Sequence, residues 1–192
     1  MVSVMKNLLL VLVMTFFPQT SVGSDKEKWR HSTDFDIIRN SDIVGEWRYP
    51  TKSDVFGDWK YFQKKYPTPW HVEADFNNDG FLDHAWILFS RDNTKWGLHV
   101  FMSSGADSYK VITLDENLFS FFPPQRMGLS VLQPGRYQSY CAQGFGPECK
   151  DGEAEFIVIS NPSIDYITFE AANSYYIWNE KVSKFDRIWM GD

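Results

Sequence analysis

The sequence predicts an α+β fold in a single domain, mainly antiparallel β-sheet with one short N-terminal helix. From about residue 70 onward, segments rich in aliphatic and aromatic residues alternate with short turns of Gly, Asn, Asp and Ser, which is typical of strands. Only one segment, before residue 67, has apolar side chains at helical spacing that we interpret as a helix. About 170 residues follow a predicted N-terminal leader, enough for one well-packed domain.

The leader, residues 1–23, has the pattern of a secretory signal peptide. Lys6 supplies a positive charge, residues 8–17 are apolar, and Ser21 to Gly23 fit a small-x-small cleavage site. The apolar run is shorter than the roughly 20 residues that span a bilayer comfortably. We therefore expect an exported protein, periplasmic or secreted, whose mature domain is residues 24–192 and has no membrane span. An uncleaved membrane anchor is the alternative.

The composition restricts the partners. The formal net charge is −6, and loss of the leader would remove Lys6 and leave the chain one charge more acidic. Clustered Lys and Arg are needed to neutralise phosphates, and the sequence has no basic run, so we exclude nucleic acid as a partner. Aromatic residues make up 17% of the chain, which indicates a core of large rings or a surface that uses some of them for binding.

One helix is predicted, over about residues 54–65. Ser53 and Asp54 are candidate N-caps. The apolar residues that follow at roughly helical spacing are Val55, Trp59, Phe62 and Tyr66. Pro67 and Pro69 end the helix, because a residue before proline is disfavoured in the helical region. For residues 33–39 a short helix and a strand both remain open.

A β-meander is predicted next. Residues 83–89 are apolar on both faces, as in a central buried strand. A turn at 91–94 leads to a strand at 96–102, and a second turn at 103–107 leads to a strand at 109–114.

The remainder is predicted as more strands after a long connection. Residues 115–138 contain three prolines and are predicted to be irregular, with room for a short helix. Strands are predicted at 155–160 and 164–170. A closing hairpin is predicted from 175–178 and 185–190, and we expect its aromatic side chains to pack across the strands.

The stretch from Asp75 to Asp83 has the spacing of a calcium-binding loop. Oxygen-bearing side chains fall at alternate positions, and Gly80 lies where the backbone bends most sharply. The predicted ligands are Asp75, Asn77, Asp79, Phe81 (through its backbone carbonyl) and Asp83. An EF-hand would need a bidentate glutamate where this chain has Trp86, so the loop is not an EF-hand.

This motif resembles the calcium loop of FG-GAP or VCBS-type repeats, in which Asp-x-Asn-x-Asp-Gly-x-x-Asp leads directly into a β-strand. The resemblance covers about residues 70–114. In those families the motif recurs and the ion is mostly structural, whereas this chain has one copy. The resemblance therefore implies a structural calcium ion, and it implies neither a propeller nor an activity. A metal-free acidic turn is the alternative.

Cys141 and Cys149 are the only cysteines. In an exported protein we expect them to form one disulfide, although a redox pair or half of a metal site are alternatives. A short loop closed by a disulfide and containing Gly and Pro is a poor place to bury rings. Tyr140 and Phe145 are therefore candidate contact residues for a partner.

Catalytic signals are weak. His84 and His99 would be cross-strand partners in an acid/base or zinc site, but ordinary sheet histidines fit the same pattern. No Gly-x-Ser-x-Gly elbow is present. Four carboxylates are available for glycoside hydrolysis: Glu153, Glu155, Asp165 and Glu170.

These observations favour a non-enzymatic exported binding protein, such as an inhibitor or immunity-type protein, with a structural calcium ion. Its acidity would suit a basic protein partner. The alternative is a cell-envelope hydrolase or carbohydrate-binding domain that acts on envelope polysaccharide. A structural envelope component is a third possibility.

Overall fold

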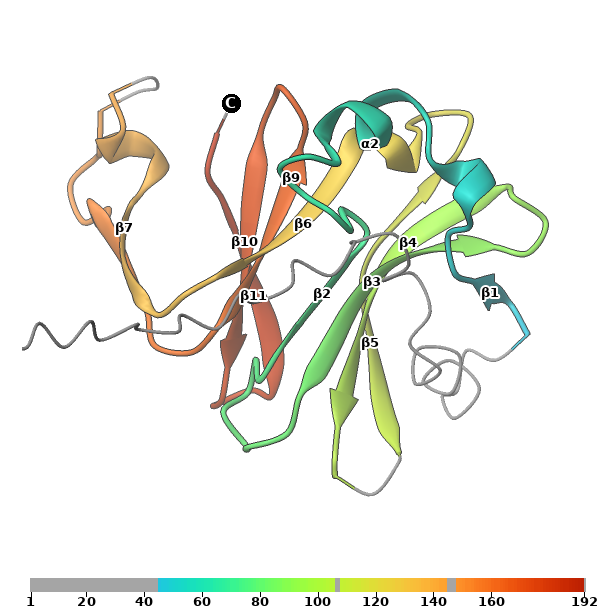
Figure 1. Ribbon diagram of the computed structural model, residues 1–192. Coiled ribbons are helices and arrows are strands. Elements are labelled where there is room, and N and C mark those ends of the chain that lie inside the picture. Colours follow the sequence, from blue (N-terminus) through green and yellow to red (C-terminus); the bar gives the residue numbers. More distant parts are fainter. Residues whose placement is uncertain (1–44, 106–107, 145–147, 192) are drawn as a thin grey trace, which may run out of the picture. The chain divides into compact units, whose positions relative to one another are not determined.

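Antiparallel strands make up most of the regular secondary structure (Figure 1). The computed structural model describes residues 45–105, 108–144 and 148–191, which all belong to one compact unit. The predicted leader, residues 1–23, and the undecided segment 33–39 lie outside the described residues. Within the described ranges, no helix combines the length and the apolarity that crossing a bilayer requires.

The first sheet contains the predicted meander. Its strands are β1 (Trp47–Arg48), β2 (His71–Ala74), β3 (Asp83–Ser90), β4 (Lys95–Ser103) and β5 (Tyr109–Leu118). They are ordered β1-β3-β4-β5, and β2 also pairs with β3. The meander β3-β4-β5 is confirmed, with β5 longer than predicted. The central strand β3 is buried on both faces, as its continuous apolar sequence predicts.

The second sheet contains β6 (Met127–Leu132), β9 (Ser163–Thr168), β10 (Asn173–Asn179) and β11 (Lys184–Trp189), in the order β11-β10-β9-β6. The predicted closing hairpin is confirmed as β10 and β11. A separate two-stranded sheet pairs β7 (Gly135–Gln138) with β8 (Phe156–Ile159).

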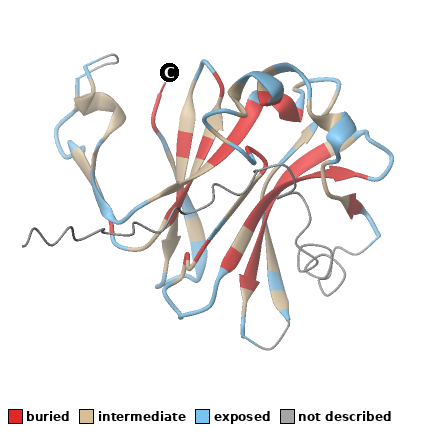
Figure 2. Ribbon diagram, in the orientation of Figure 1, coloured by how far each residue is buried: buried red, intermediate tan, exposed pale blue. Residues whose placement is uncertain are grey.

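The two larger sheets share one hydrophobic core (Figure 2). The Tyr166 hydroxyl on β9 donates a 3.0 Å hydrogen bond to Oδ2 of Asp115 on β5. The segment before β2 joins the sheets through its backbone, because the carbonyl of Trp70 accepts the N–H of Ile87 and the carbonyl of Pro69 accepts the N–H of Leu129. The first sheet and the start of its β2–β3 hairpin are thus fixed against the second sheet.

The predicted helix is shorter than expected. The α-helix α2 is Gly57–Phe62, and Lys52–Asp54 form a separate 3₁₀ turn, η1. The carboxylate of Asp54 does not cap α2, since it accepts the backbone N–H of Thr51 at 2.7 Å and pairs with Arg48 at 2.8 Å. The helix ends before Pro67, as predicted.

The prediction of an irregular segment at 115–138 was wrong in part. A short helix, η2 (Pro124–Arg126), is present, but β6 and β7 follow it. Tertiary packing explains β6, since it pairs with β9 along its length and Gly128 lets the ring of Phe169 lie against the strand. A Cβ atom at Gly128 would lie 2.5 Å from that ring. The prolines precede and follow β6 and do not interrupt it.

Trp59 on α2 provides a test of this core. Its side chain is fully buried, stacks on Phe89 at 5.7 Å, and donates a 2.7 Å hydrogen bond from Nε1 to the carbonyl of Met127. We expect Trp59→Ala to lower the free energy of unfolding by about 3–5 kcal/mol, because it leaves a cavity and removes this bond. Urea unfolding measures the change. Tyr61→Ala on the same helix removes a ring that is 73% exposed and should cost under about 1 kcal/mol. Similar costs for both variants would contradict the packing described.

Candidate functional site

The predicted calcium loop connects β2 to β3, and its first carboxylate is held by the backbone. Oδ1 of Asp75 accepts the N–H of Asp79 at 3.0 Å, and Oδ2 accepts the N–H of Gly80 at 2.8 Å. Gly80 has a φ of +91°, in the left-handed region that glycine adopts without strain. The loop backbone therefore curls around Asp75.

Hydrogen bonds also order the other side chains of the loop. Oδ1 of Asn77 accepts the N–H of Asp79 at 3.2 Å, and its Nδ2 donates to Oδ2 of Asp79 at 2.8 Å. Oδ1 of Asp79 accepts the N–H of Phe81 at 2.9 Å. The ring of Phe81 is about half exposed and lies over Gly105. The alternate oxygen-bearing positions thus share one small, internally bonded turn.

Asp83 lies at the base of this loop, fully buried at the start of β3. Its Oδ2 accepts the N–H of Phe76 at 3.0 Å and its Oδ1 accepts the N–H of Ser103 at 2.8 Å. The pKa of Asp83 is raised to about 6: burial is the main cause, the negative charges of Asp79 and Asp75 add to the rise, and the two hydrogen bonds oppose it. A cation between these carboxylates would offset the repulsion among their negative charges.

The donor set suits a hard cation. Carboxylate, amide and backbone carbonyl oxygens are the ligands that calcium prefers, and each carboxylate oxygen that accepts an N–H keeps a second lone pair. When bound, the ion would neutralise the mutual repulsion of the loop carboxylates. The residues present therefore fit the metal that the motif implies.

The two histidines singled out from the sequence do not pair with each other. In the register of β3 and β4, His99 lies opposite Trp86, and His84 lies opposite Phe101. His99 is fully buried, and its Nδ1 lies 3.0 Å from the hydroxyl of Thr113. It is therefore a core histidine.

His84 instead lies beside His71, a pairing that was not predicted from the sequence. Nε2 of His71, on β2, lies 3.2 Å from Nδ1 of His84. Glu73, also on β2, approaches the same Nδ1 at 3.8 Å. The sequence does contain a signal for part of this cluster, because His71 and Glu73 are two residues apart and would share a face on a strand. Strand β2 itself was not predicted, and the juxtaposition was missed with it.

The predicted disulfide between Cys141 and Cys149 is present. It lies between β7 and β8, and we call the described residues 135–144 and 148–159 the disulfide arm (Figure 1). The ring of Tyr140 packs against Trp189 with centroids 4.7 Å apart, so this candidate contact residue is half-buried. Phe145, the other candidate, lies outside the described residues.

Two of the four candidate carboxylates lie in the disulfide arm, and the other two lie on or just after β9. Glu153 and Glu155 are in the disulfide arm, and Glu170 follows β9. Asp165, on β9, accepts hydrogen bonds from Ser130 at 3.1 Å and Asn173 at 2.9 Å, and burial raises its pKa. These hydrogen bonds link Asp165 to the neighbouring strands β6 and β10, so its carboxylate has a structural role within the sheet.

Comparison with known proteins adds no further assignment. No family model matches the chain, and neither a similar curated protein nor a similar solved structure was found. The functional argument therefore depends on the residues and their geometry.

The buried His99 makes stability depend on pH. Burial lowers its pKa to about 4; nearby Glu46 opposes the shift and Lys95 adds to it. The unfolded chain, with a pKa near 6.5, takes up the proton first, so stability present above pH 6.5 is lost as the pH falls towards 4. The loss attributable to His99 should be about 3 kcal/mol.

Urea unfolding between pH 7.5 and 4.5 tests this, with His99→Asn as the comparison. Asparagine can keep the bond to Thr113 but does not titrate, so the variant should be less stable at pH 7.5 and lose less stability on acidification. A variant whose stability falls with pH as steeply as the wild type would show that His99 is not the responsible group.

Proposed function

We propose that this protein is an exported, non-enzymatic binding protein whose β2–β3 hairpin is stabilised by one calcium ion. The ion would be held by the oxygens of Asp75, Asn77, Asp79, Phe81 and Asp83. The observation that carries the calcium proposal is Asp83, a fully buried carboxylate that has the charges of Asp75 and Asp79 as neighbours. Carboxylates that raise one another's pKa favour either a bound cation or a protonated acid, and the loop motif favours the cation.

Export is supported by two independent features. The disulfide between Cys141 and Cys149 is the kind of bond that persists outside the reducing cytoplasm. The N-terminal sequence has the pattern of a signal peptide. Compartments outside the cytoplasm can also supply calcium, which agrees with the proposed ion site.

The disulfide arm is the proposed contact surface. The disulfide and the pairing of β7 with β8 restrain its shape, which reduces the entropy lost on binding. Val158 on β8 is 72% exposed, and Trp189, which packs on Tyr140 of the arm, is 50% exposed. The exposed carboxylates of the arm are Glu148, Asp151, Glu153 and Glu155. These four carboxylates outnumber the exposed cations of the arm, Arg136 and Lys150, and an apolar contact on an acidic arm suits a basic protein partner, as for an inhibitor or immunity-type protein.

Asp79→Ala tests the calcium site. We expect the substitution to lower the melting temperature in millimolar calcium and to change it little in chelator. The reason is that the carboxylate of Asp79 acts as a ligand only when the ion is present. A calcium concentration 100-fold above the dissociation constant stabilises by about 2.7 kcal/mol, which corresponds to roughly 5–10 °C for a domain of this size. Thermal unfolding followed by circular dichroism measures both conditions.

Glu180→Ala is the matched control, since it also removes one carboxylate, at an exposed position in the β10–β11 turn. Its melting temperature should respond to calcium as the wild type does. Equal destabilisation of Asp79→Ala in calcium and in chelator would contradict the metal site and leave an acidic turn as its explanation.

The contact surface is tested by affinity capture from extracts of the source organism, with the wild type, Val158→Asp and Val182→Asp. Val158 lies in the arm, whereas Val182 is a comparably exposed valine in the β10–β11 turn. We expect one stoichiometric, basic protein partner that Val158→Asp loses and Val182→Asp keeps, with capture weakening as salt rises. Retention on envelope polysaccharide without a protein partner would instead support the hydrolase or carbohydrate-binding class.

A further inference from the structure

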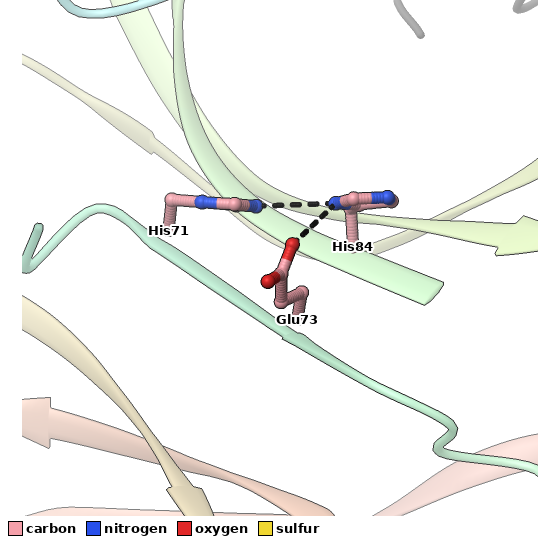
Figure 3. A group of neighbouring side chains, drawn as sticks. All are labelled: His71, Glu73 and His84. Carbon is pink, nitrogen blue, oxygen red and sulfur yellow. Dashed lines mark hydrogen bonds and ion pairs between the residues drawn. The ribbon is translucent and has the colours of Figure 1, made fainter. Parts of the chain in front are cut away.

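Two histidines and a glutamate, His71, His84 and Glu73, converge on one face of the β2–β3 hairpin (Figure 3). In the antiparallel register, Glu73 lies directly opposite His84, and His71 lies opposite Trp86. His71 and Glu73 are two residues apart on β2, so their side chains share a face with that of His84. The next residue along β3 from the calcium ligand Asp83 is His84, whose side chain therefore points to the opposite face.

We propose that His71, Glu73 and His84 bind one divalent transition-metal ion of the zinc type, through Nε2 of His71, Nδ1 of His84 and a carboxylate oxygen of Glu73. These three ligand atoms lie within 4.8 Å of one another. Imidazole nitrogens favour zinc, copper and nickel, whereas the oxygen-only loop favours calcium. The proposed site is therefore chemically distinct from the calcium loop.

The spacing of the nitrogens fits a shared ion. Two nitrogens bound to one tetrahedral zinc at about 2.0–2.1 Å lie about 3.3 Å apart. The observed distance between Nε2 of His71 and Nδ1 of His84 is 3.2 Å. The same distance suits a hydrogen bond between two neutral imidazoles, so the ion would take the place of one shared proton.

The two imidazoles are held in position by aromatic neighbours. The ring of His71 stacks on Trp86, with centroids 3.9 Å apart and planes 19° apart. The ring of Tyr109, on β5, meets His84 edge-on at 6.1 Å. Rings fixed in this way lose little further freedom when they bind an ion, which is the preorganisation that metal sites require.

Glu73 provides the third ligand and also lies on the path by which an ion from solvent reaches the imidazoles. Its side chain is 58% exposed, whereas that of His84 is 13% exposed, so an ion from solvent reaches the imidazoles past the carboxylate. The carboxylate oxygen lies 3.8 Å from Nδ1 of His84, and the exposed side chain of Glu73 has room to adjust its position around an ion. Three protein ligands leave the fourth position of a tetrahedral ion for water or a group from a partner.

The test is a zinc titration of the protein without a polyhistidine tag, expressed from its full sequence and stripped of metal, in competition with a chromogenic chelator. We expect one zinc per chain. His84→Ala and His71→Ala should each weaken binding on the order of 100-fold or more, since loss of a supporting residue alone costs 10–100-fold. His99→Asn removes a histidine outside the cluster and should bind zinc as the wild type does.

Two further measurements keep the test decisive if a histidine variant fails to fold. Glu73→Gln changes an exposed side chain without altering its size, and it should fold and bind zinc on the order of 10-fold more weakly. In the wild type, nitrogen-15 NMR of the imidazoles should show zinc-dependent shifts at Nε2 of His71 and Nδ1 of His84. A lack of zinc binding at micromolar concentrations, or binding that Glu73→Gln and the NMR signals of these two rings do not sense, would overturn the proposal.

Asp79→Ala separates this inference from the proposed function. This variant should lose its response to calcium and keep its affinity for zinc, because its carboxylate belongs to the oxygen loop. Glu73→Gln should show the reverse. Loss of both responses in either variant would indicate a single shared site and overturn the assignment of two.

Discussion

The burial of β3 on both faces is the constraint on which the rest of the structure depends. This strand pairs with β1, β2 and β4, and the side chains of both of its faces belong to the hydrophobic core. A shift of one residue in its register would exchange the two faces. The positions of Asp83 and His84 are therefore fixed together, because consecutive residues of a strand point to opposite sides. The alternation of side chains along β3 therefore determines which face each of the two proposed ion sites occupies.

Much of the first sheet was predictable because its signals are local. The continuous apolar run of β3 indicates a strand buried on both faces, and the turns after it fix the meander. The disulfide followed from the number and spacing of the cysteines. Asp75, Asn77 and Asp79 are hydrogen-bonded to one another within a single turn, because they lie so close together in sequence.

The parts that were missed depend on contacts between distant segments. Strand β6 has prolines on both sides in sequence, and its identity as a strand comes from pairing with β9, more than thirty residues away. Helix α2 begins later than expected because Asp54 is engaged by Arg48, on β1. The meeting of His71 with His84 required β2 to be recognised, and β2 is only four residues long.

The β2–β3 hairpin has a consequence for the order of folding. All ligands of both proposed sites lie between His71 and His84, whereas β6 must find β9 across a much longer chain. The entropy cost of closing a loop grows with its length, and contacts that are local in sequence form sooner. Ions that bind this hairpin would therefore favour a route in which it closes early and presents β3 as a template for the later strands. Metal supply in the compartment where the chain folds would then influence how fast it folds as well as how stable it becomes.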